Sequence, residues 1–342
     1  MPSATTGAKK RALSGIQPTG STHLGNYLGA LRWWVDFQDH YDAFYCVVDL
    51  HALTIPGDPE ELRKDTLTMA MVLLACGLDP ARCTLFVQSH VHEHAELTWL
   101  LECTASMGEL QRMTQFKDKA ARGGEEAARV ALFAYPVLQA ADILLYDADL
   151  VPVGDDQRQH LELTRDLAQR WNGRYGRTFT LPEAVIPPPG GGARVMDLQD
   201  PSRKMSKSAA SDAGVVYLFD DPKVIEHKVK RAVTDLDPPG PSAVRWDREA
   251  KPGVSNLLEL IAAIAGGKPE EVATRYSSYG QLKNDVAEAV ITAARPIQER
   301  YREIAADPGA VREVLAKGAE RASEVASMTL RRAQDMIGLL PR

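Results

Sequence analysis

Residues 43–50 read AFYCVVDL, a nearly continuous apolar run that is rich in aromatic and β-branched side chains. A run without the polar alternation of a half-exposed strand is typical of a strand buried on both faces of a parallel sheet. It lies between two stretches with helical spacing, residues 24–41 and 59–76, and a further strand is expected at 11–16. This order predicts an α/β fold with a doubly wound parallel sheet, whose ligands bind beyond the carboxyl ends of the strands.

The same alternation continues toward the middle of the chain. The pattern predicts strands at residues 84–88 and 150–153, and helices at 96–115, 127–146 and 156–171. The first half therefore forms a Rossmann-like sheet with helices between its strands.

The second half has a different character. Residues 187–192 (PPPGGG) form a loop by composition, and strand signals nearly vanish after Ser208. From residue 221 to 340 the sequence predicts about six helices separated by proline or glycine. We expect three parts: a flexible tail at 1–11, a Rossmann-like domain at 12–196 and an all-helical domain at 197–342.

The composition limits the possible classes of function. With 44% hydrophobic and 25% charged residues, this chain of 342 residues is an ordinary globular protein, and its length suggests two domains. Its net charge of −6 argues against a protein that coats nucleic acid, although a specific RNA partner needs only a local basic face. No apolar run approaches the ~18 residues of a membrane span, and the first eleven residues lack the apolar core of a secretory signal.

The four cysteines form no C-x-x-C pair. We expect buried, reduced thiols and a cytoplasmic location, because a disulfide framework or a zinc site would need a different spacing. The cysteines are Cys46, Cys76, Cys83 and Cys103.

Residues 17–20 (QPTG) and 23–26 (HLGN) form a glycine-containing turn that leads from a predicted strand into a helix. Free N–H groups and the dipole at a helix start favour an anion there, and Gly25 lets a nucleotide approach the backbone closely. The alternative is a helix start that merely needs small residues, with His23 at the surface.

Residues 204–208 (KMSKS) place two lysines three positions apart beside two hydroxyls, between the predicted domains. A lysine about 4 Å from a phosphate charge contributes on the order of 4 kcal/mol at an effective dielectric of ~20, before desolvation. Such a loop can stabilise the charge that develops on a leaving pyrophosphate. A solvated basic linker is the alternative, and the presence of the first motif favours phosphate binding.

The two motifs resemble the HIGH and KMSKS signatures of class I aminoacyl-tRNA synthetases. Longer stretches resemble the bacterial tryptophanyl-tRNA synthetases, over essentially everything after residue 11. These stretches are SGIQPTG (14–20), GNY (25–27), MTQFKDK (113–119), AADILLY (140–146), VPVGDDQ (151–157), AVTD (232–235), GVSNLL (253–258) and PIQER (296–300).

The resemblance implies a ligase that activates L-tryptophan with ATP, releases pyrophosphate and transfers tryptophan to the 2′-hydroxyl of the terminal adenosine of tRNA. It also implies a mobile KMSKS loop, an anticodon-binding helical domain and a homodimer. The apolar stretch at 96–113 resembles the family's dimer interface, although core packing explains the same residues.

The same resemblance implies the residues of an ATP site. Lys119, Lys204 and Lys207 would hold the triphosphate together with Mg²⁺, and with Asn26 they are the expected catalytic residues. No metal ligand is expected among the protein side chains. The other implied ATP contacts are Gln17, Pro18, Thr19, His23, Gly25, Gly154, Asp155, Asp156, Gln157, Val195, Met205, Ser206 and Ser208.

A tryptophan pocket is implied around Asp142, whose carboxylate would accept the indole N–H. A carboxylate within the apolar stretch AADILLY is costly to bury without a donor, and a site built on this bond can reject an analogue lacking the N–H by ~10⁴-fold. The alternative is a surface or salt-bridged carboxylate. The other implied pocket residues are Leu13, Gly15, His51, Gln115, Tyr135, Gln139, Val151 and Val153.

Three positions depart from the residues that are frequent in the family. His23 stands where many relatives have threonine, and Leu13 and Gln139 stand where phenylalanine and methionine are common. We hypothesise that Leu13 and Gln139 alter the response to tryptophan analogues. Competition assays on Gln139→Met and Leu13→Phe test this hypothesis, and unchanged inhibitor constants would contradict it.

Two weaker signals have ordinary structural explanations. His90, His92 and His94 could ligate zinc in an extended segment, but this segment is expected to enter a helix, where the spacing would not persist. Residues 223–231 are locally basic and form either a solvated helix face or a contact for tRNA phosphates.

Three other functions stay open at this point. A tyrosyl-tRNA synthetase shares the fold and is distinguished by ATP–pyrophosphate exchange with tyrosine. Another nucleotidyltransferase with a histidine-containing phosphate motif would need neither the lysine loop nor a long helical domain. An auxiliary or regulatory paralogue is the third, and the intact motif residues argue against lost chemistry without deciding between a main and a second copy.

Overall fold

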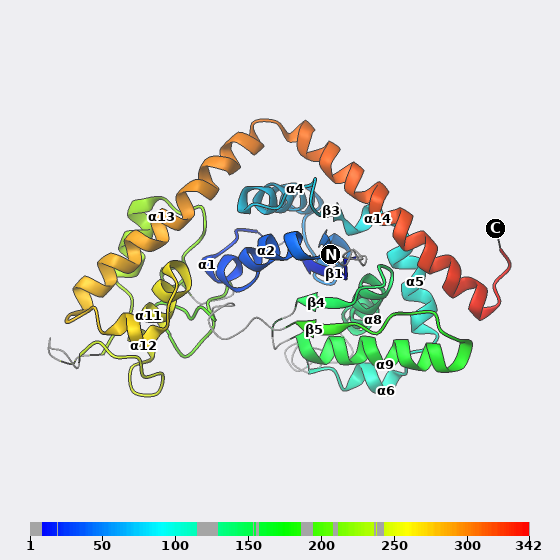
Figure 1. The fold of residues 1–342 in the computed structure, drawn as a ribbon, viewed down its shortest axis with the longest axis horizontal. Coiled ribbons are helices and arrows are strands. Elements are labelled where there is room, and N and C mark those ends of the chain that lie inside the picture. Colours follow the sequence, from blue (N-terminus) through cyan, green and yellow to red (C-terminus); the bar gives the residue numbers. More distant parts are fainter. Residues whose placement is uncertain are drawn as a thin grey trace, which may run out of the picture.

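In the computed structural model, the described part of the chain forms one sheet of five parallel strands (Figure 1). The strand order is β3-β2-β1-β4-β5. The chain moves from β1 outward to β3, returns to the centre with β4 and ends at β5, so a topological switch point lies between β1 and β4. The strands are β1 (Arg11–Ile16), β2 (Asp42–Val47), β3 (Thr84–Val87), β4 (Leu150–Pro152) and β5 (Glu183–Val185).

The structure describes residues 9–18, 20–114, 129–152, 154, 157–185, 194–207, 211–235, 237 and 243–341. No helix among these residues is both long and apolar enough to cross a membrane. The helices of the sheet half are α1 (Leu24–Asn26), the π-helix η1 (Tyr27–Leu31), α2 (Arg32–His40), α3 (Asp49–Ala52), α4 (Pro59–Cys76), the 3₁₀-helix η2 (Gln88–His90), α5 (Glu93–Glu102), α6 (Met107–Gln111), α8 (Val130–Leu144) and α9 (Arg158–Tyr175). The later helices are the 3₁₀-helix η5 (Asp212–Gly214), α10 (Pro222–Lys230), α11 (Pro252–Ala265), α12 (Pro269–Ala273), α13 (Tyr279–Ala305) and α14 (Pro308–Ile337).

Strand β2 is buried on both faces, as its apolar run predicts. Phe44 and Cys46 face a core that includes side chains of α5, α8 and α9, whereas Tyr45 and Val47 face a core that includes side chains of α2 and α4. Because consecutive side chains of a strand point to opposite faces, a continuous apolar run is the pattern that two covered faces require.

The C-terminal helices divide between two parts of the molecule. Side chains of α10 to α13 form a core with Leu24, Leu28, Val195 and Met205. Figure 1 shows α13 rising to meet α14, which then runs down beside β3 and α5. Alanine side chains of α14 pack into the same core as α5, α8 and α9, so this helix completes the sheet half although it is last in sequence. The predicted domain limits stay a prediction.

Several sequence-based expectations need correction. The helix expected at 96–115 is two helices, α5 and α6, because Ser106 starts a new helix with a capping box to Glu109. This break leaves Cys103 exposed, whereas the other three cysteines are buried as predicted. Strand β5 was not predicted, since three residues carry little pattern. Within the described part of residues 221–340 there are five helices instead of about six. Of the expected tail, residues 1–8 lie outside the described residues, and Arg11 already belongs to β1.

Gly318 on α14 allows the close approach of this helix to β3. A Cβ added there would lie 1.8 Å from the carbonyl oxygen of Leu85, so Gly318→Ala must displace the helix. We expect a loss of ~1–3 kcal/mol in the free energy of unfolding, measured by chemical denaturation. Gly173→Ala on α9, where an added Cβ meets open space, is the control and should be neutral or stabilising by up to ~1 kcal/mol. Equal effects of the two substitutions would contradict this account of α14.

Candidate active site

The carboxyl edge of the sheet gathers the predicted ligand-binding side chains. Gly15 is the last residue but one of β1, and a Cβ added there would lie 2.8 Å from Cγ1 of Val48, which directly follows β2. His51 lies on α3, directly after β2, and Gln88 directly follows β3. Parallel strands bring these strand ends to one edge, which is where ligands bind in such sheets.

The Asp142 carboxylate lies at this edge and is 4% exposed. Its Oδ2 is 2.8 Å from Nε2 of His51, and its Oδ1 is 2.7 Å from Nε2 of Gln88 and 2.6 Å from Nδ1 of His94. Burial raises the pKa of this carboxyl group, but the hydrogen bonds from His51 and His94 outweigh burial and hold the pKa well below its usual range. The carboxylate is therefore ionised at neutral pH and accepts all three bonds.

These contacts correct one step of the sequence argument. The protein supplies the donors that stabilise the buried carboxylate, so Asp142 does not need a ligand N–H for its burial. Of the alternatives, a surface carboxylate is wrong, because Asp142 is buried. An ionised carboxylate has about four acceptor positions, so the three bonds leave capacity for one more donor.

Sequence reasoning missed two of the three partners of Asp142. Gln88 could have been found from its place at the end of a predicted parallel strand. His94 was considered only as a zinc ligand, but its side chain is fully buried against Asp142, whereas His92 is exposed. Within the described ranges no group of three or more histidine, cysteine or acidic residues is placed to hold a metal ion.

The first phosphate motif is held from both sides. His23 is the N-cap of α1: its Nδ1 accepts from the backbone N–H of Asn26 at 3.3 Å, and Asn26 Oδ1 accepts from the backbone N–H of His23 at 3.1 Å. The backbone around it pairs with the later chain, since Leu24 N donates to Val216 O at 2.8 Å and Leu218 N donates to Thr22 O at 2.9 Å. The alternative of a surface histidine is wrong, because His23 is 7% exposed.

The second motif lies against the first. Lys207 Nζ is 3.4 Å from the position that a Cβ on Gly20 would take, and Gly20 has a φ of +51°, a conformation that favours glycine. Burial lowers the pKa of Lys207, and the nearby Asp65 carboxylate opposes that shift. Asp65 also accepts the backbone N–H of Gly20 at 2.9 Å. The tertiary fold thus brings together two segments that are nearly 200 residues apart.

The backbone of the second motif is supported by the helical half. Met196 pairs with Lys204, and Met205 N donates to Val195 O at 3.0 Å. The Asn256 side chain on α11 both donates to and accepts from the backbone of Met196, each at 3.0 Å. The Met205 side chain is buried in the core with Val195, so it holds the segment in place.

The two predicted ligand regions touch each other. Gln139 Nε2 donates to Gln157 Oε1 at 3.3 Å, which joins a predicted tryptophan contact to a predicted ATP contact. Tyr135 OH is 2.8 Å from His160 Nε2, and its ring stands nearly perpendicular to that of His51 with centroids 6.1 Å apart.

The remaining predicted site residues differ in their exposure, and several lie outside the described residues. Leu13, Val151 and Pro18 are buried, whereas Gln17, Gly15, Gly154 and Lys204 are exposed and Ser206 is half-buried. Seven predicted residues lie outside the described residues: Thr19, Gln115, Lys119, Val153, Asp155, Asp156 and Ser208.

A parallel sheet with a glycine-containing turn after its first strand, met by a lysine segment from beyond the sheet, agrees with the class that the sequence motifs resemble, the class I aminoacyl-tRNA synthetases. Comparisons with known proteins agree with this class. Residues 5–295 match the family described as tRNA synthetases class I (W and Y).

Individual relatives narrow the family further. Tryptophan–tRNA ligase 2 of Streptomyces avermitilis is 55% identical over 97% of this chain and 98% of its own length. The crystal structure of tryptophanyl-tRNA synthetase from Mycoplasma pneumoniae superposes with a TM-score of 0.87 at 38% identity, covering 97% of this chain and 98% of that chain. The crystal structure of the Campylobacter jejuni enzyme, described as a complex with ADP and tryptophan, superposes with a TM-score of 0.80 at 34% identity. It covers 96% of this chain and 100% of that chain.

The chain therefore belongs to the tryptophan–tRNA ligases, within the class I tRNA synthetases for tryptophan and tyrosine. The family predicted from the sequence motifs is confirmed, and the tyrosyl enzyme and the unrelated nucleotidyltransferase are excluded as alternatives.

The protonation of His23 gives a test of this arrangement. Burial and then the charges of Lys207 and Lys204 lower its pKa from 6.5 to about 4. Because the folded pKa is depressed, this contribution to stability is complete above pH 6.5 and is lost as the pH falls toward 4. We expect the free energy of unfolding of the wild type to fall more steeply over this range than that of His23→Asn, by at most ~1.4 kcal/mol per pH unit.

Denaturation curves at several pH values measure both slopes. Asparagine keeps a capping side chain at this position, so the variant should fold. His40→Asn, which changes an exposed histidine on α2, is the control and should keep the wild-type slope. A His23→Asn slope equal to that of the wild type would show that His23 does not lie in this electrostatic environment.

Proposed function

We propose that this tryptophan–tRNA ligase binds MgATP between residues 17–26 and 204–207, and binds L-tryptophan against Asp142. The observation that carries the proposal is the position of Lys207 beside the turn at Gly20, with both lysines close enough to His23 to lower its pKa. The Campylobacter jejuni relative, described as a complex with ADP and tryptophan, supports the same two ligands here.

The ATP region would act through positioning and charge. A carboxylate oxygen of tryptophan attacks the α-phosphorus in line, the bond from that phosphorus to the bridging oxygen breaks, and pyrophosphate leaves with the electron pair. Lys204 and Lys207, with the Mg²⁺ that enters on ATP, would neutralise the charge that grows on pyrophosphate. His23 is neutral at pH 7, so it adds no charge of its own.

The tryptophan region would act through the free acceptor capacity of Asp142. An indole N–H that donates to this carboxylate makes a charge-assisted hydrogen bond in a buried site, where an analogue without the donor leaves the acceptor unpaired. Tyr135, next to the His51 ring, and Gln139 would line the same pocket.

The second reaction needs tRNA. The 2′-hydroxyl of its terminal adenosine attacks the carbonyl carbon of tryptophanyl-adenylate, and AMP leaves. The basic helix α10 would contact a tRNA phosphate, because Lys223, His227 and Arg231 line a hollow of about 400 Å³ that also reaches Gln199 and Asp212 near the lysine segment. The helices α11 to α13 would carry the anticodon contact.

Pyrophosphate exchange with purified protein tests the assignment. We expect tryptophan-dependent and not tyrosine-dependent exchange, followed by charging of tRNA. Lys207→Met should lower kcat of exchange by ~10²–10³-fold, because one charge contact on the leaving group is lost. Asp142→Asn should raise KM for tryptophan by ~10–100-fold, as expected for one charge-assisted hydrogen bond.

The control is Arg203→Met, which removes the exposed charge immediately before the lysine segment and should change neither constant. Well-folded wild-type protein without tryptophan-dependent exchange would overturn the proposed function. Unchanged kcat in Lys207→Met would overturn the proposed ATP site.

We also propose a homodimer in the cytoplasm, with α5, α6 and the start of α8 as the interface. Trp99 on α5 is 67% exposed, and Met107 on α6 and Val130 at the start of α8 are exposed as well. Both α5 and α6 pack against α8, and exposed large apolar side chains on neighbouring elements are typical of a protein interface.

Analytical ultracentrifugation tests the interface. We expect a dimer for the wild type and a shift to monomer for Trp99→Glu, because a buried, unpaired carboxylate opposes association. Met328→Glu on α14 changes a side chain that is 59% exposed and should leave the dimer intact. A dimer that survives Trp99→Glu, or one that Met328→Glu disrupts equally, would contradict the proposed surface.

A further inference from the structure

Two further buried polar side chains, His94 and Tyr146, lie behind Asp142 and are joined to it by hydrogen bonds. His94 uses Nδ1 toward Asp142, and its Nε2 is 2.8 Å from the hydroxyl of Tyr146. Both rings are fully buried. Phe86 packs against each of them, with centroid distances of 5.9 Å to His94 and 5.5 Å to Tyr146, and Phe44 packs on Tyr146 at 4.9 Å. The apolar rings leave the two hydrogen bonds as the polar contacts of the His94 imidazole.

The chemistry of the three groups assigns the protons. An ionised carboxylate only accepts, so Nδ1 of His94 must carry a hydrogen toward Asp142. In a neutral imidazole Nε2 is then an acceptor, and the Tyr146 hydroxyl donates to it. Burial, together with the negative groups near it, raises the pKa of Tyr146, so the hydroxyl keeps its proton. The opposite tautomer would point a lone pair at the carboxylate, so Tyr146 selects the tautomer that stabilises Asp142.

The C-terminal helix α14 binds the sequence neighbours of both residues. Ser323 Oγ donates to Glu93 Oε1 at 2.8 Å, and Ser327 Oγ donates to the same oxygen. Glu93 directly precedes His94 in the first turn of α5 and is buried. These bonds fix the start of α5, from which the His94 side chain projects toward Asp142.

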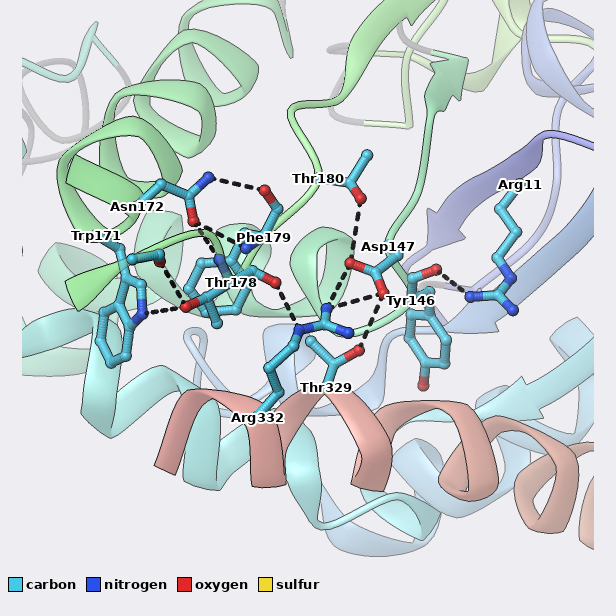
Figure 2. A network of polar contacts seen from close by, with 11 residues as sticks. Arg11, Tyr146, Asp147, Trp171, Asn172, Thr178, Phe179, Thr180, Thr329 and Arg332 are labelled. Carbon is cyan, nitrogen blue, oxygen red and sulfur yellow. Dashed lines mark hydrogen bonds and ion pairs between the residues drawn. The ribbon is translucent and has the colours of Figure 1, made fainter. Parts of the chain in front are cut away.

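On the other side, α14 holds the residue that follows Tyr146. Figure 2 shows Arg332 reaching Asp147, with Nη2 2.7 and 2.9 Å from its two carboxylate oxygens and Nε donating to Thr178 O at 2.7 Å. Asp147 has a φ of +46°, which is unfavourable for a residue with a side chain. Arg332, whose Nη2 donates to both oxygens of Asp147, and Thr180, whose hydroxyl donates to Asp147 at 3.2 Å, stabilise this turn.

We propose that His94 and Tyr146 are positioning residues that hold the Asp142 carboxylate toward the amino-acid substrate, and that α14 fixes both of them through Glu93 and Asp147. The inference rests on the proposed role of Asp142 in binding the indole N–H. It makes the last helix of the chain part of the amino-acid site, although α14 has no described contact with Asp142 itself.

Removal of the Tyr146 hydroxyl tests whether its hydrogen bond to His94 positions Asp142. Tyr146→Phe keeps the ring packing and leaves Nε2 of His94 without its donor. We expect KM for tryptophan in pyrophosphate exchange to rise about tenfold, the equivalent of one hydrogen bond, while KM for ATP stays within twofold. Tyr45→Phe is the matched control, because Tyr45 is equally buried and donates to Trp34 O at 2.7 Å outside the site.

The control separates positioning from general stability. Both variants should lose a similar amount of thermal stability, but only Tyr146→Phe should weaken the binding of tryptophan. If the two variants change KM for tryptophan equally, or neither changes it, Tyr146 is a structural residue and the proposal is wrong.

A substrate analogue gives a second measurement, which a general loss of protein stability does not change. In an analogue with sulfur in place of the ring N–H, Asp142 has no donor to meet, so its orientation no longer contributes to binding. We expect the preference of the wild type for tryptophan over this analogue to fall about tenfold in Tyr146→Phe. An unchanged preference would overturn the proposed role of the hydroxyl.

Substitution of two arginines of α14 tests whether this helix acts on the amino-acid site. Arg332→Met removes the bond to Asp147, whereas Arg321→Met removes a comparable ion pair to Asp42, 2.7 Å long, at the far end of β2. We expect a two- to fivefold rise in KM for tryptophan with Arg332→Met, and no change in either KM with Arg321→Met. Equal KM values for the two variants would exclude α14 from the amino-acid site.

Asp142→Asn distinguishes failure of this inference from failure of the proposed function. If Asp142→Asn leaves KM for tryptophan unchanged, the proposed tryptophan site is wrong, and the positioning role is wrong with it. If Asp142→Asn raises KM for tryptophan but Tyr146→Phe and Arg332→Met do not, the proposed site stands and only the positioning role is overturned.

Discussion

The Asp142 carboxylate is a charge inside an apolar core, and its burial sets conditions for much of the structure. A buried charge costs several kcal/mol unless hydrogen-bond donors surround it. Those donors come from α3, from the end of β3 and from α5, which are far apart in the sequence. They can meet at one carboxylate only because parallel strands end at the same edge. The buried carboxylate is therefore stable only in a fold whose strand ends bring its three donors to the same edge of the sheet.

The second constraint is the contact between the two halves of the molecule at the phosphate motifs. Backbone pairing of residues 22–24 with 216–218 and the Asn256 side chain bound to Met196 fix the segment that carries the lysines. Two cationic side chains are thereby held beside a histidine whose pKa burial and those charges keep low. An anionic ligand would relieve this concentration of positive charge, which supports the proposed binding of a polyphosphate here.

The sheet half is closed by the last helix of the chain. Small side chains on α14, above all Gly318 against Leu85, permit close packing, while Arg332 and two serines bind residues next to the buried His94 and Tyr146. The same helix thus contributes both to the apolar core and to the polar shell behind Asp142. A division of the chain into a sheet half and a helical half by sequence position does not capture this dual role.

The sequence by itself determined the features that local patterns encode. The strand at 11–16 and the helix at 59–76 were predicted with the bounds that the structure has, because the apolar spacing that marks them is local. The structure adds that Asp58 caps the start of this helix and that Gly77 ends it in a left-handed conformation, and both signals are local as well. The two phosphate motifs were recognised from their glycines, histidine and lysines, and with the longer stretches they identified the family. The tertiary structure decided which residues meet: His23 is buried, Lys207 lies beside Gly20, and Gln88 and His94 bind Asp142. Such contacts join residues 48 to almost 200 positions apart, and burial and pairing at that range leave no periodic signal in the sequence.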